Sequence, residues 1–195
     1  MSNSNYLDGQ ILIAMPGMGD PRFDKSLIFL CAHSENGAMG IMLNKTAPLM
    51  FFSDLVDQLK IFPDGKMKNL ESSVLNMPIL FGGPVEQFRG FVLHSMDYFT
   101  KNTSLPINDG VALTATVEIL QAIASGEGPA KVTLALGYSG WVAGQLENEM
   151  QHNGWLYCDA DDDLLFGADN GGKYIRALRK IGVDPLMLSS ETGHA

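Results

Sequence analysis

Ser26-Leu-Ile-Phe-Leu-Cys-Ala-His-Ser-Glu-Asn-Gly-Ala-Met-Gly-Ile-Met-Leu-Asn44 is the stretch that decides how this chain folds. Two apolar runs flank Asn36-Gly37, and Asn-Gly between such runs is the strongest short-range signal for a β-hairpin with a type I′ turn. The run Leu27 to Ala32 is apolar at every position, as in a central strand that is covered on both faces. The sequence therefore predicts a hairpin in the middle of a sheet.

The register of this hairpin predicts which side chains share a face. With Asn36-Gly37 as the loop, the expected pairs are His33 with Gly40, Cys31 with Met42 and Phe29 with Asn44. Because side chains alternate along a strand, Cys31, His33 and Asn44 are then expected on one face. A thiol, an imidazole and an amide suit a nucleophile with its base. They equally suit core filling, a strand-end contact and a turn cap, and we favour these structural roles.

Length and composition favour a compact protein of the cytoplasm. A chain of 195 residues with 46% hydrophobic residues fits a single domain over residues 1–195. Its longest apolar run is far shorter than the roughly 20 residues that cross a bilayer, and the first residues resemble no secretory signal. Two cysteines are too few for a disulfide framework. We therefore expect a cytoplasmic protein with no membrane attachment.

The formal net charge of −9 restricts the choice of partner. Such a surface repels phosphate backbones unless basic groups are clustered, which disfavours direct binding of nucleic acid. The last predicted helix is locally basic on one side, in contrast to the acidic net charge. That side is formed by Lys173, Arg176, Arg179 and Lys180. A solvated helix face is the simpler interpretation of that side.

The remaining patterns predict an α+β fold. Further strands are expected at residues 10–15, 78–81, 89–96, 111–116, 131–136 and 155–158, and helices at 52–59, 117–124, 142–150 and 174–181. Strands occur both in hairpins and beside helices, so we expect a mixed, mainly antiparallel sheet with about four flanking helices. The 21 glycines favour bulges and strong curvature, with a partly closed barrel as the extreme form.

Two glycine-rich segments each follow a predicted strand. Gly137-Tyr138-Ser139-Gly140-Trp141 resembles the Gly-x-Ser-x-Gly nucleophile elbow between a strand and a helix, but its last residue is tryptophan. Gly82-Gly83-Pro84 lacks the Lys and Ser/Thr of a phosphate-binding loop. Tight turns explain both segments, and backbone N–H groups at such turns also suit a small anionic ligand. The candidate ligand-binding residues are Asn44, Gly82, Gly83, Pro84, Gly137, Ser139, Gly140, Trp141 and Gln145.

No metal or cofactor site is predicted. Asp159, Asp161 and Asp163 are spaced like the start of a calcium loop. Leu164 stands where that loop needs glycine, and Asn170 where it needs glutamate. The His and Cys spacings also match no zinc pattern.

Several of these stretches together resemble the AlgH/YqgE family of bacterial proteins. The matching segments are Leu12 to Pro16, Phe23 with Ser26, the hairpin from Gly37 to Asn44, Gly82 to Val85, Leu93-His94, and Gly137 to Trp141 with Gly144 to Glu147 and Glu149. Lys45-Thr46 departs from the family, which tends to have a basic residue and proline there, and Tyr174-Ile175 stands where a tryptophan is usual. The resemblance implies a compact, cytoplasmic α+β domain. The family name implies a transcriptional regulator, but neither a helix-turn-helix nor the charge supports DNA binding.

Three classes of function follow from these patterns. We favour a non-enzymatic binding or regulatory protein that holds a small ligand or a protein partner at the glycine-rich segments. The first alternative is a small hydrolase that uses Ser139 or Cys31 with His33 or His94. The second is a DNA-binding transcriptional regulator that acts through its basic last helix.

Overall fold

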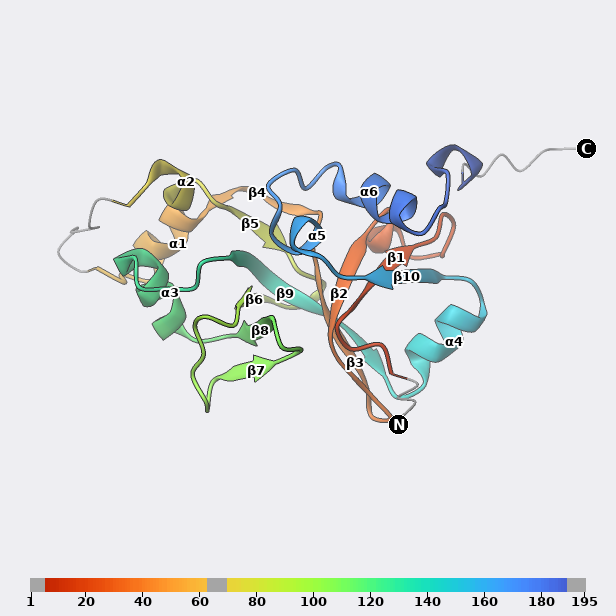
Figure 1. Ribbon diagram of the computed structural model, residues 1–195, viewed down its shortest axis with the longest axis horizontal. Coiled ribbons are helices and arrows are strands. Elements are labelled where there is room, and N and C mark those ends of the chain that lie inside the picture. The colour runs from red at the N-terminus through yellow and green to blue at the C-terminus, as the bar shows by residue number, and fades with distance from the viewer. Residues whose placement is uncertain (1–5, 63–69, 189–195) are drawn as a thin grey trace, which may run out of the picture. The chain divides into compact units, whose positions relative to one another are not determined.

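The structure of this chain is a computed structural model that describes residues 6–62 and 70–188 (Figure 1). The first five residues, on which the expected absence of a secretory signal partly rests, lie outside this range. The chain divides into two compact units, residues 1–45 with 139–195, and residues 46–138. The division into units does not decide the number of domains, so the single domain expected over residues 1–195 stays a prediction.

The first unit contains an antiparallel sheet with the strand order β10-β1-β2-β3-β9. Its strands are β1 (Gln10–Ala14), β2 (Leu27–Ser34), β3 (Gly37–Met42), β10 (Trp155–Asp159) and the C-terminal part of β9 (Val132–Val142). Its helices are α4 (Gln145–Gln151), α5 (Asp162–Phe166) and α6 (Lys173–Lys180), with short 3-10 turns at Pro21–Phe23 and Pro185–Leu188. Ile11 to Ala14 of β1 and Leu27 to Cys31 of β2 are buried, as their hydrophobicity predicts, whereas Ala32 at the end of the apolar run is exposed.

The second unit contains a mixed sheet with the strand order β4-β5-β9-β6-β8-β7. Its strands are β4 (Thr46–Phe51), β5 (Pro78–Phe81), β6 (Val85–Ser95), β7 (Ser104–Pro106), β8 (Val111–Thr114) and the N-terminal part of β9. Only the β5–β9 pair is parallel among the described strands. The helices are α1 (Phe52–Gln58), α2 (Ser72–Leu75) and α3 (Val117–Ser125).

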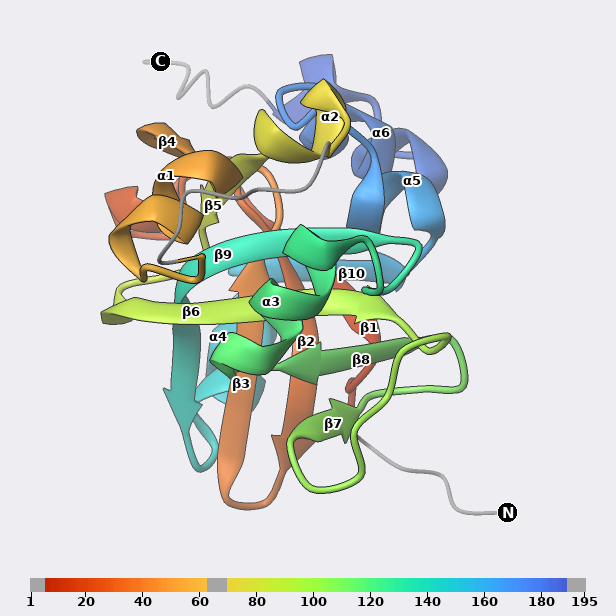
Figure 2. The same cartoon turned by 90° about the vertical axis from the view of Figure 1, so that its left-hand side faces the viewer.

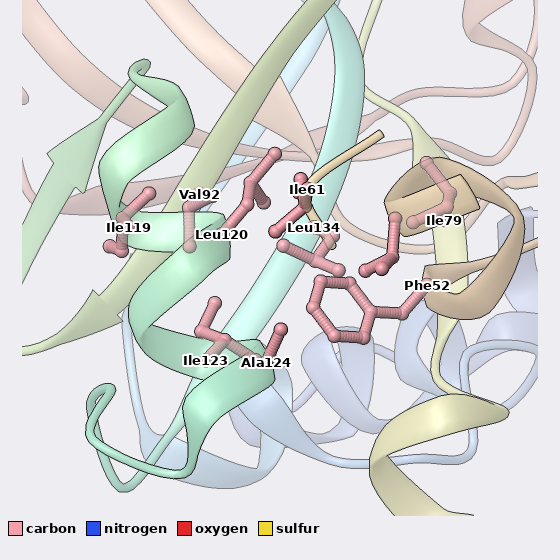
Figure 3. Close-up of a cluster of buried hydrophobic side chains, with 10 residues drawn as sticks. Phe52, Ile61, Ile79, Val92, Ile119, Leu120, Ile123, Ala124 and Leu134 are labelled. Carbon is pink, nitrogen blue, oxygen red and sulfur yellow. The ribbon is translucent and has the colours of Figure 1, made fainter. Parts of the chain in front are cut away.

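The core of the second unit lies between its sheet and two helices. Figure 2 shows α3 in front of β6 and β9. Figure 3 shows a cluster of buried hydrophobic side chains from both helices and the sheet. Its members include Ile119, Leu120 and Ile123 of α3, Val92 of β6, Leu134 of β9 and Phe52 of α1. The i, i+1, i+4 spacing on α3 places three large side chains on one face, and Gly126 ends the helix with a left-handed φ of +78°.

The predicted fold class is confirmed. The chain is an α+β protein with a mixed, mainly antiparallel, curved sheet. Four of the six α-helices in the described residues have seven or more residues, which matches the expected number of flanking helices. Irregular pairing interrupts β2, β4 and β6, as the glycine content predicts.

The turn of the central hairpin lies one residue earlier than the sequence predicts. Ser34 pairs with Gly37, so Glu35 and Asn36 form the turn, and His33 pairs with Ala38 instead of Gly40. Gly37 is the first residue of β3, with a φ of +124°, and a Cβ atom there would collide with the carbonyl oxygen of Trp141. The predicted register was wrong because close approach to β9, and not the turn, requires this glycine.

A bulge at Cys31 shifts the register a second time. The pairs between β2 and β3 change between Leu30 and Ala32, so Cys31 has no pairing partner in β3. Gly40 therefore pairs with Leu30, where a Cβ atom would collide with the β2 backbone and a side chain of Ile28. The expected pairs of Cys31 with Met42 and of Phe29 with Asn44 were consequently wrong as well.

No helix in residues 6–62 and 70–188 has the length and apolar character needed to span a bilayer.

Candidate functional site

Gly82 and Gly83 pack against Gly137, backbone against backbone, within the second unit. The N–H group of Gly82 donates to the carbonyl oxygen of Leu136 over 2.8 Å. A Cβ atom on Gly82 would collide with the carbonyl oxygen of Gly137, and one on Gly137 with that of Gly83. Close packing explains why glycine is needed at these positions without any ligand. Ligand binding by Gly82, Gly83, Pro84 and Gly137 therefore gains no support from their spacing and stays a prediction.

The segment from Gly137 to Trp141 lies inside strand β9, so the predicted strand-to-helix turn was wrong. Ser139 pairs with Gly40 of β3 and is fully buried, whereas a nucleophile elbow exposes its serine. The helix begins only at Gln145, after Gly144 has reversed the chain with a φ of +75°. Pairing with β3 extends the strand through a sequence in which the glycines suggest a turn.

Glu149 of α4 connects both tryptophans of the chain. Its Oε2 accepts hydrogen bonds from the indole Nε1 of Trp141 over 2.9 Å and from that of Trp155 over 2.8 Å. Its Oε1 accepts one from the side-chain amide of Gln145 over 2.9 Å. Trp141 and Trp155 are buried and meet edge to face, with ring centroids 5.8 Å apart. Trp141 and Gln145, two of the candidate ligand-binding residues, therefore hold α4 against the sheet.

His33 has a structural partner on each ring nitrogen. The backbone N–H of Leu7 donates to Nδ1 over 2.9 Å, so the ring proton is on Nε2 and points to Glu147 Oε1 at 3.0 Å. The imidazole is buried and also meets the ring of Tyr6 edge to face. Because Nδ1 already accepts a hydrogen bond, His33 has no free nitrogen with which to act as a base.

Cys31 and Asn44 also have structural roles. Burial raises the pKa of the Cys31 thiol to about 12, so the sulfur is protonated and weakly nucleophilic at neutral pH. Asn44 accepts from the N–H of Leu27 over 2.9 Å and donates to the carbonyl oxygen of Lys25 over 2.8 Å, which caps the start of β2. His33 lies six residues further along that strand, roughly 20 Å away at 3.3 Å per residue. The structure therefore does not bring Asn44 together with His33.

A buried polar network at His94 was not predicted from the sequence. His94 Nδ1 donates to the carbonyl oxygen of Ser95 over 3.0 Å, and Nε2 lies 2.7 Å from the hydroxyl of Thr114. A hydrogen bond of 2.8 Å joins that hydroxyl to the one of Ser104, which accepts from the N–H of Thr100. The β7–β8 pairing places Ser104 opposite Thr114, and no local pattern predicts that pairing. Both nitrogens of His94 are engaged, so it too lacks a free position for catalysis.

The stability of the second unit is expected to fall as the pH drops below about 6.5. Burial lowers the pKa of His94 from its usual value of 6.5, while the carbonyl of Ser95 and the carboxylate of Asp97 oppose this shift. Below pH 6.5 the unfolded chain therefore binds a proton that the folded chain resists, and unfolding becomes more favourable. Urea denaturation at pH 7.5 and 5.5 measures this change. The His94→Gln variant is expected to show a smaller pH dependence; an equal dependence in both proteins would contradict the assignment.

The basic side predicted for the last helix is largely neutralised. Lys173 is 1% exposed and donates to the carbonyl oxygen of Leu43 over 3.2 Å. Arg176 forms ion pairs of 2.7 Å with Asp163 and with Asp169. Lys180 pairs with Asp161. Arg179 and Lys180 are exposed, so the solvated basic face predicted here holds for them but not for the buried Lys173. Spacing on a helix does not reveal the acidic partners that neighbouring segments supply.

An apolar pocket of about 170 Å³ opens on the second unit. Leu55 of α1, Leu59 directly after α1, and Val117 and Leu120 of α3 line it. Phe91 of β6 and Leu134 of β9 belong to its sheet side. Leu120 and Leu134 also belong to the core cluster in Figure 3, so the pocket is an opening into that core. Such a concave apolar surface is the usual form of a ligand site.

One charged group and one open position distinguish this pocket. The guanidinium of Arg89 lies 5.3 Å from the centroid of the Phe91 ring and 3.1 Å from the carboxylate of Glu86. Gly90 also lines the pocket, and a Cβ atom there would meet nothing within 4 Å. At the mouth Phe88 is 99% exposed. The sequence predicts an ordinary strand for Arg89-Gly90-Phe91, because the irregular pairing of β6 with the distant β9 leaves no local signal.

Comparison with known proteins identifies similar chains in bacteria. Residues 11–186 match a family model described as AlgH-like. A UPF0301 protein of Bradyrhizobium diazoefficiens is 58% identical over 194 residues, covering 100% of this chain and 91% of the relative. The solution structure of the AlgH protein from Pseudomonas aeruginosa is 37% identical, has a TM-score of 0.77, and covers 100% of this chain and 99% of that one. Protein DIP2367 of Corynebacterium diphtheriae shares the fold, with a TM-score of 0.66 at 17% identity, over 90% of this chain and 89% of its own.

Proposed function

This chain belongs to the AlgH-like family, as its motifs predict, and we propose that it is a non-enzymatic binding protein whose site is the apolar pocket of the second unit. The proposed ligand is a small carboxylic acid with an apolar ring or a short alkyl chain. The observation that supports this proposal is an open apolar cavity with a guanidinium group at its mouth. A bacterial cytoplasmic location is part of the proposal, supported by two buried free cysteines.

The size and lining of the pocket favour a small apolar body. A cavity of about 170 Å³ is smaller than the roughly 300–1,000 Å³ of sites that enclose drug-sized ligands, so one ring or a short chain fits it best. Phe91, Leu120 and Leu134 offer apolar surface to such a group, and its transfer from water is favourable in proportion to the area buried.

Arg89 favours a carboxylate on the ligand. Its guanidinium presents N–H donors in a planar fork that matches the two oxygens of a carboxylate. Its present partner, Glu86, forms an exposed ion pair, with the two side chains 55% and 49% exposed. Such pairs contribute only about 0–1 kcal/mol, so the carboxylate of a ligand can replace that of Glu86 at little cost. The net charge of −9 acts weakly beyond a Debye length of about 10 Å at 0.1 M salt.

The other two classes of function have less support. A hydrolase needs a base with a free nitrogen, whereas His33 and His94 both use their two ring nitrogens in structural contacts. The thiol of Cys31 is protonated at neutral pH. For DNA binding, three of the four basic side chains on the last helix are buried or paired with aspartates.

A valine at position 90 is expected to block the pocket without disturbing the fold. Isothermal titration with hexanoate and phenylacetate should give dissociation constants below about 1 mM for the unmodified protein, the range of weak small-ligand sites. Gly90→Val should weaken binding at least tenfold, because its side chain enters free space inside the cavity. The thermal midpoint should stay equal or rise, since valine favours a strand more than glycine does.

Two further variants separate this site from unspecific binding. Gly110→Ala adds a methyl group at another roomy glycine of the second unit, outside the pocket, and should bind both acids as before. Arg89→Gln should weaken hexanoate while leaving the corresponding uncharged amide, hexanamide, unaffected. Equal affinity of Gly90→Val and the unmodified protein, or no heat of binding at millimolar acid, would contradict the proposed function.

A further inference from the structure

We propose that two copies of this chain associate through the same surface, with Phe88 of each copy inserted into the apolar pocket of the other. The proposed association is argued only from the shape and charge of this surface. Only its reversal by carboxylic acids rests on the proposed function.

An irregular segment of β6 exposes the aromatic ring. Val85 pairs with Tyr138 and Gly90 pairs with Leu136, so residues 86–89 lie opposite the single residue Gly137. Glu86 adopts a φ of +48°, which is uncommon for a residue other than glycine. The excess of residues pushes the segment out of the ladder and leaves Phe88 99% exposed. A phenylalanine ring in water is a large apolar surface that gains from burial.

The protruding ring and the cavity lie on one surface, only two residues apart. Phe88 stands at the mouth of the pocket, and Gly90 lines its interior with open space above its Cα atom. A twofold symmetric contact brings one patch against the same patch of a second copy. A patch that carries both a projection and a hollow satisfies this requirement, because each projection meets the hollow of the other copy.

The charges beside Phe88 fit the same symmetry. Glu86 and Arg89 flank the ring and form an exposed ion pair with each other. In a twofold contact each Arg89 can approach Glu86 of the second copy, so opposite charges meet. Leu59 and Val117, which are 45% and 44% exposed at the pocket, add apolar surface to the contact. The second copy is therefore a partner of matching shape, polarity and charge.

The extent of this contact limits its strength. One aromatic side chain buries about 150–250 Å², so two rings and their surroundings fall short of the roughly 1,200 Å² of stable complexes. We therefore expect a weak dimer, with a dissociation constant on the order of 100 μM. Because a carboxylic acid would occupy the same cavity as the ring, bound acid should separate the two copies.

Sedimentation velocity over 5–500 μM protein tests this association. The unmodified chain should show a sedimentation coefficient that rises with concentration, whereas Phe88→Ala and Gly90→Val should remain monomeric throughout. Leu49→Ala removes another exposed apolar side chain of the second unit, 92% exposed and outside the pocket, and should associate like the unmodified chain. Circular dichroism and thermal midpoints establish that each variant is folded.

The outcomes separate this inference from the proposed function. An unmodified chain that stays monomeric at 500 μM, or a Phe88→Ala variant that associates equally well, would overturn the dimer. Loss of association in both pocket variants, with no effect of 20 mM hexanoate on the unmodified chain, would support the dimer and count against the acid site. Dissociation by hexanoate but not by hexylamine would support both.

Discussion

Replacement of Glu149 by alanine is expected to lower the free energy of unfolding by about 2–5 kcal/mol, because two buried indole N–H groups lose their acceptor. Trp141 and Trp155 donate to the same carboxylate oxygen and are 6% and 3% exposed, so solvent cannot readily replace it. Each unsatisfied buried donor costs about 1–3 kcal/mol. The change also removes the contact that holds α4 against the sheet of the first unit.

Urea denaturation followed by tryptophan fluorescence measures this effect directly. The chain contains two tryptophans, and both are partners of Glu149, so the signal reports on this site. Gln145→Ala is the matched control, since it removes an exposed hydrogen bond to the same carboxylate and should cost less than about 1 kcal/mol. A loss below 1 kcal/mol in Glu149→Ala would mean that the indoles find other acceptors.

Replacement of Lys173 by methionine is expected to raise the free energy of unfolding at pH 7 by about 2 kcal/mol. Burial lowers the pKa of Lys173 from 10.5 to about 8, and the nearby Arg176 adds to this shift, while Asp163 and Asp169 oppose it. Such a lowering of the pKa corresponds to roughly 3 kcal/mol of unfavourable charge burial. Loss of the hydrogen bond to the carbonyl of Leu43 offsets about 1 kcal/mol of the gain.

The advantage of Lys173→Met should depend on pH in a defined direction. Below about pH 8 the lysine is protonated in both folded and unfolded chains, so the folded protein bears the full cost. Between about pH 8 and 10.5 the unfolded chain binds more protons, so the stability of the unmodified protein rises with pH and the difference shrinks. Denaturation of both proteins at pH 7 and pH 10 tests this. Lys180→Met, at a surface pair, should be nearly neutral; destabilisation by Lys173→Met at pH 7 would contradict the prediction.

Much of the fold follows from local patterns. The buried run Leu27 to Leu30, the helical spacing of Ile119, Leu120 and Ile123, and Gly126 at the helix end each specify an element through short-range physics. These signals depend on residues within one turn or one strand, which is why the α+β class could be predicted.

The register of the hairpin could not be predicted from the same kind of signal. Asn36-Gly37 satisfies the preference of a turn, but the backbone of Trp141, more than 100 residues away, decides where glycine is needed. Cys31 then adds a bulge that no local preference indicates. Turn propensity describes only neighbouring residues, so it cannot predict a register that a contact with a distant strand determines.

Most of the candidate site depends on contacts that are distant in sequence. Glu149 meets Trp141 and Trp155, His33 meets Glu147, and the acceptor of Lys173 is Leu43, 130 residues away. The residues around the pocket come from two helices and three strands, joined only after the sheet has formed. The glycine motifs identified strained or crowded backbone correctly, but they did not indicate which chemistry lies beside it.

The crossing of Gly82 and Gly83 with Gly137 limits how this sequence can diverge. A side chain at Gly82 or Gly137 would meet main-chain oxygen, which is present whatever residue occupies the opposing position. Mutations elsewhere can shrink a side chain but cannot remove a carbonyl group, so no single compensating substitution restores the fit. During evolution Gly82 and Gly137 should therefore be conserved independently of function. Conservation of these glycines would reflect backbone packing and would not by itself indicate a catalytic role.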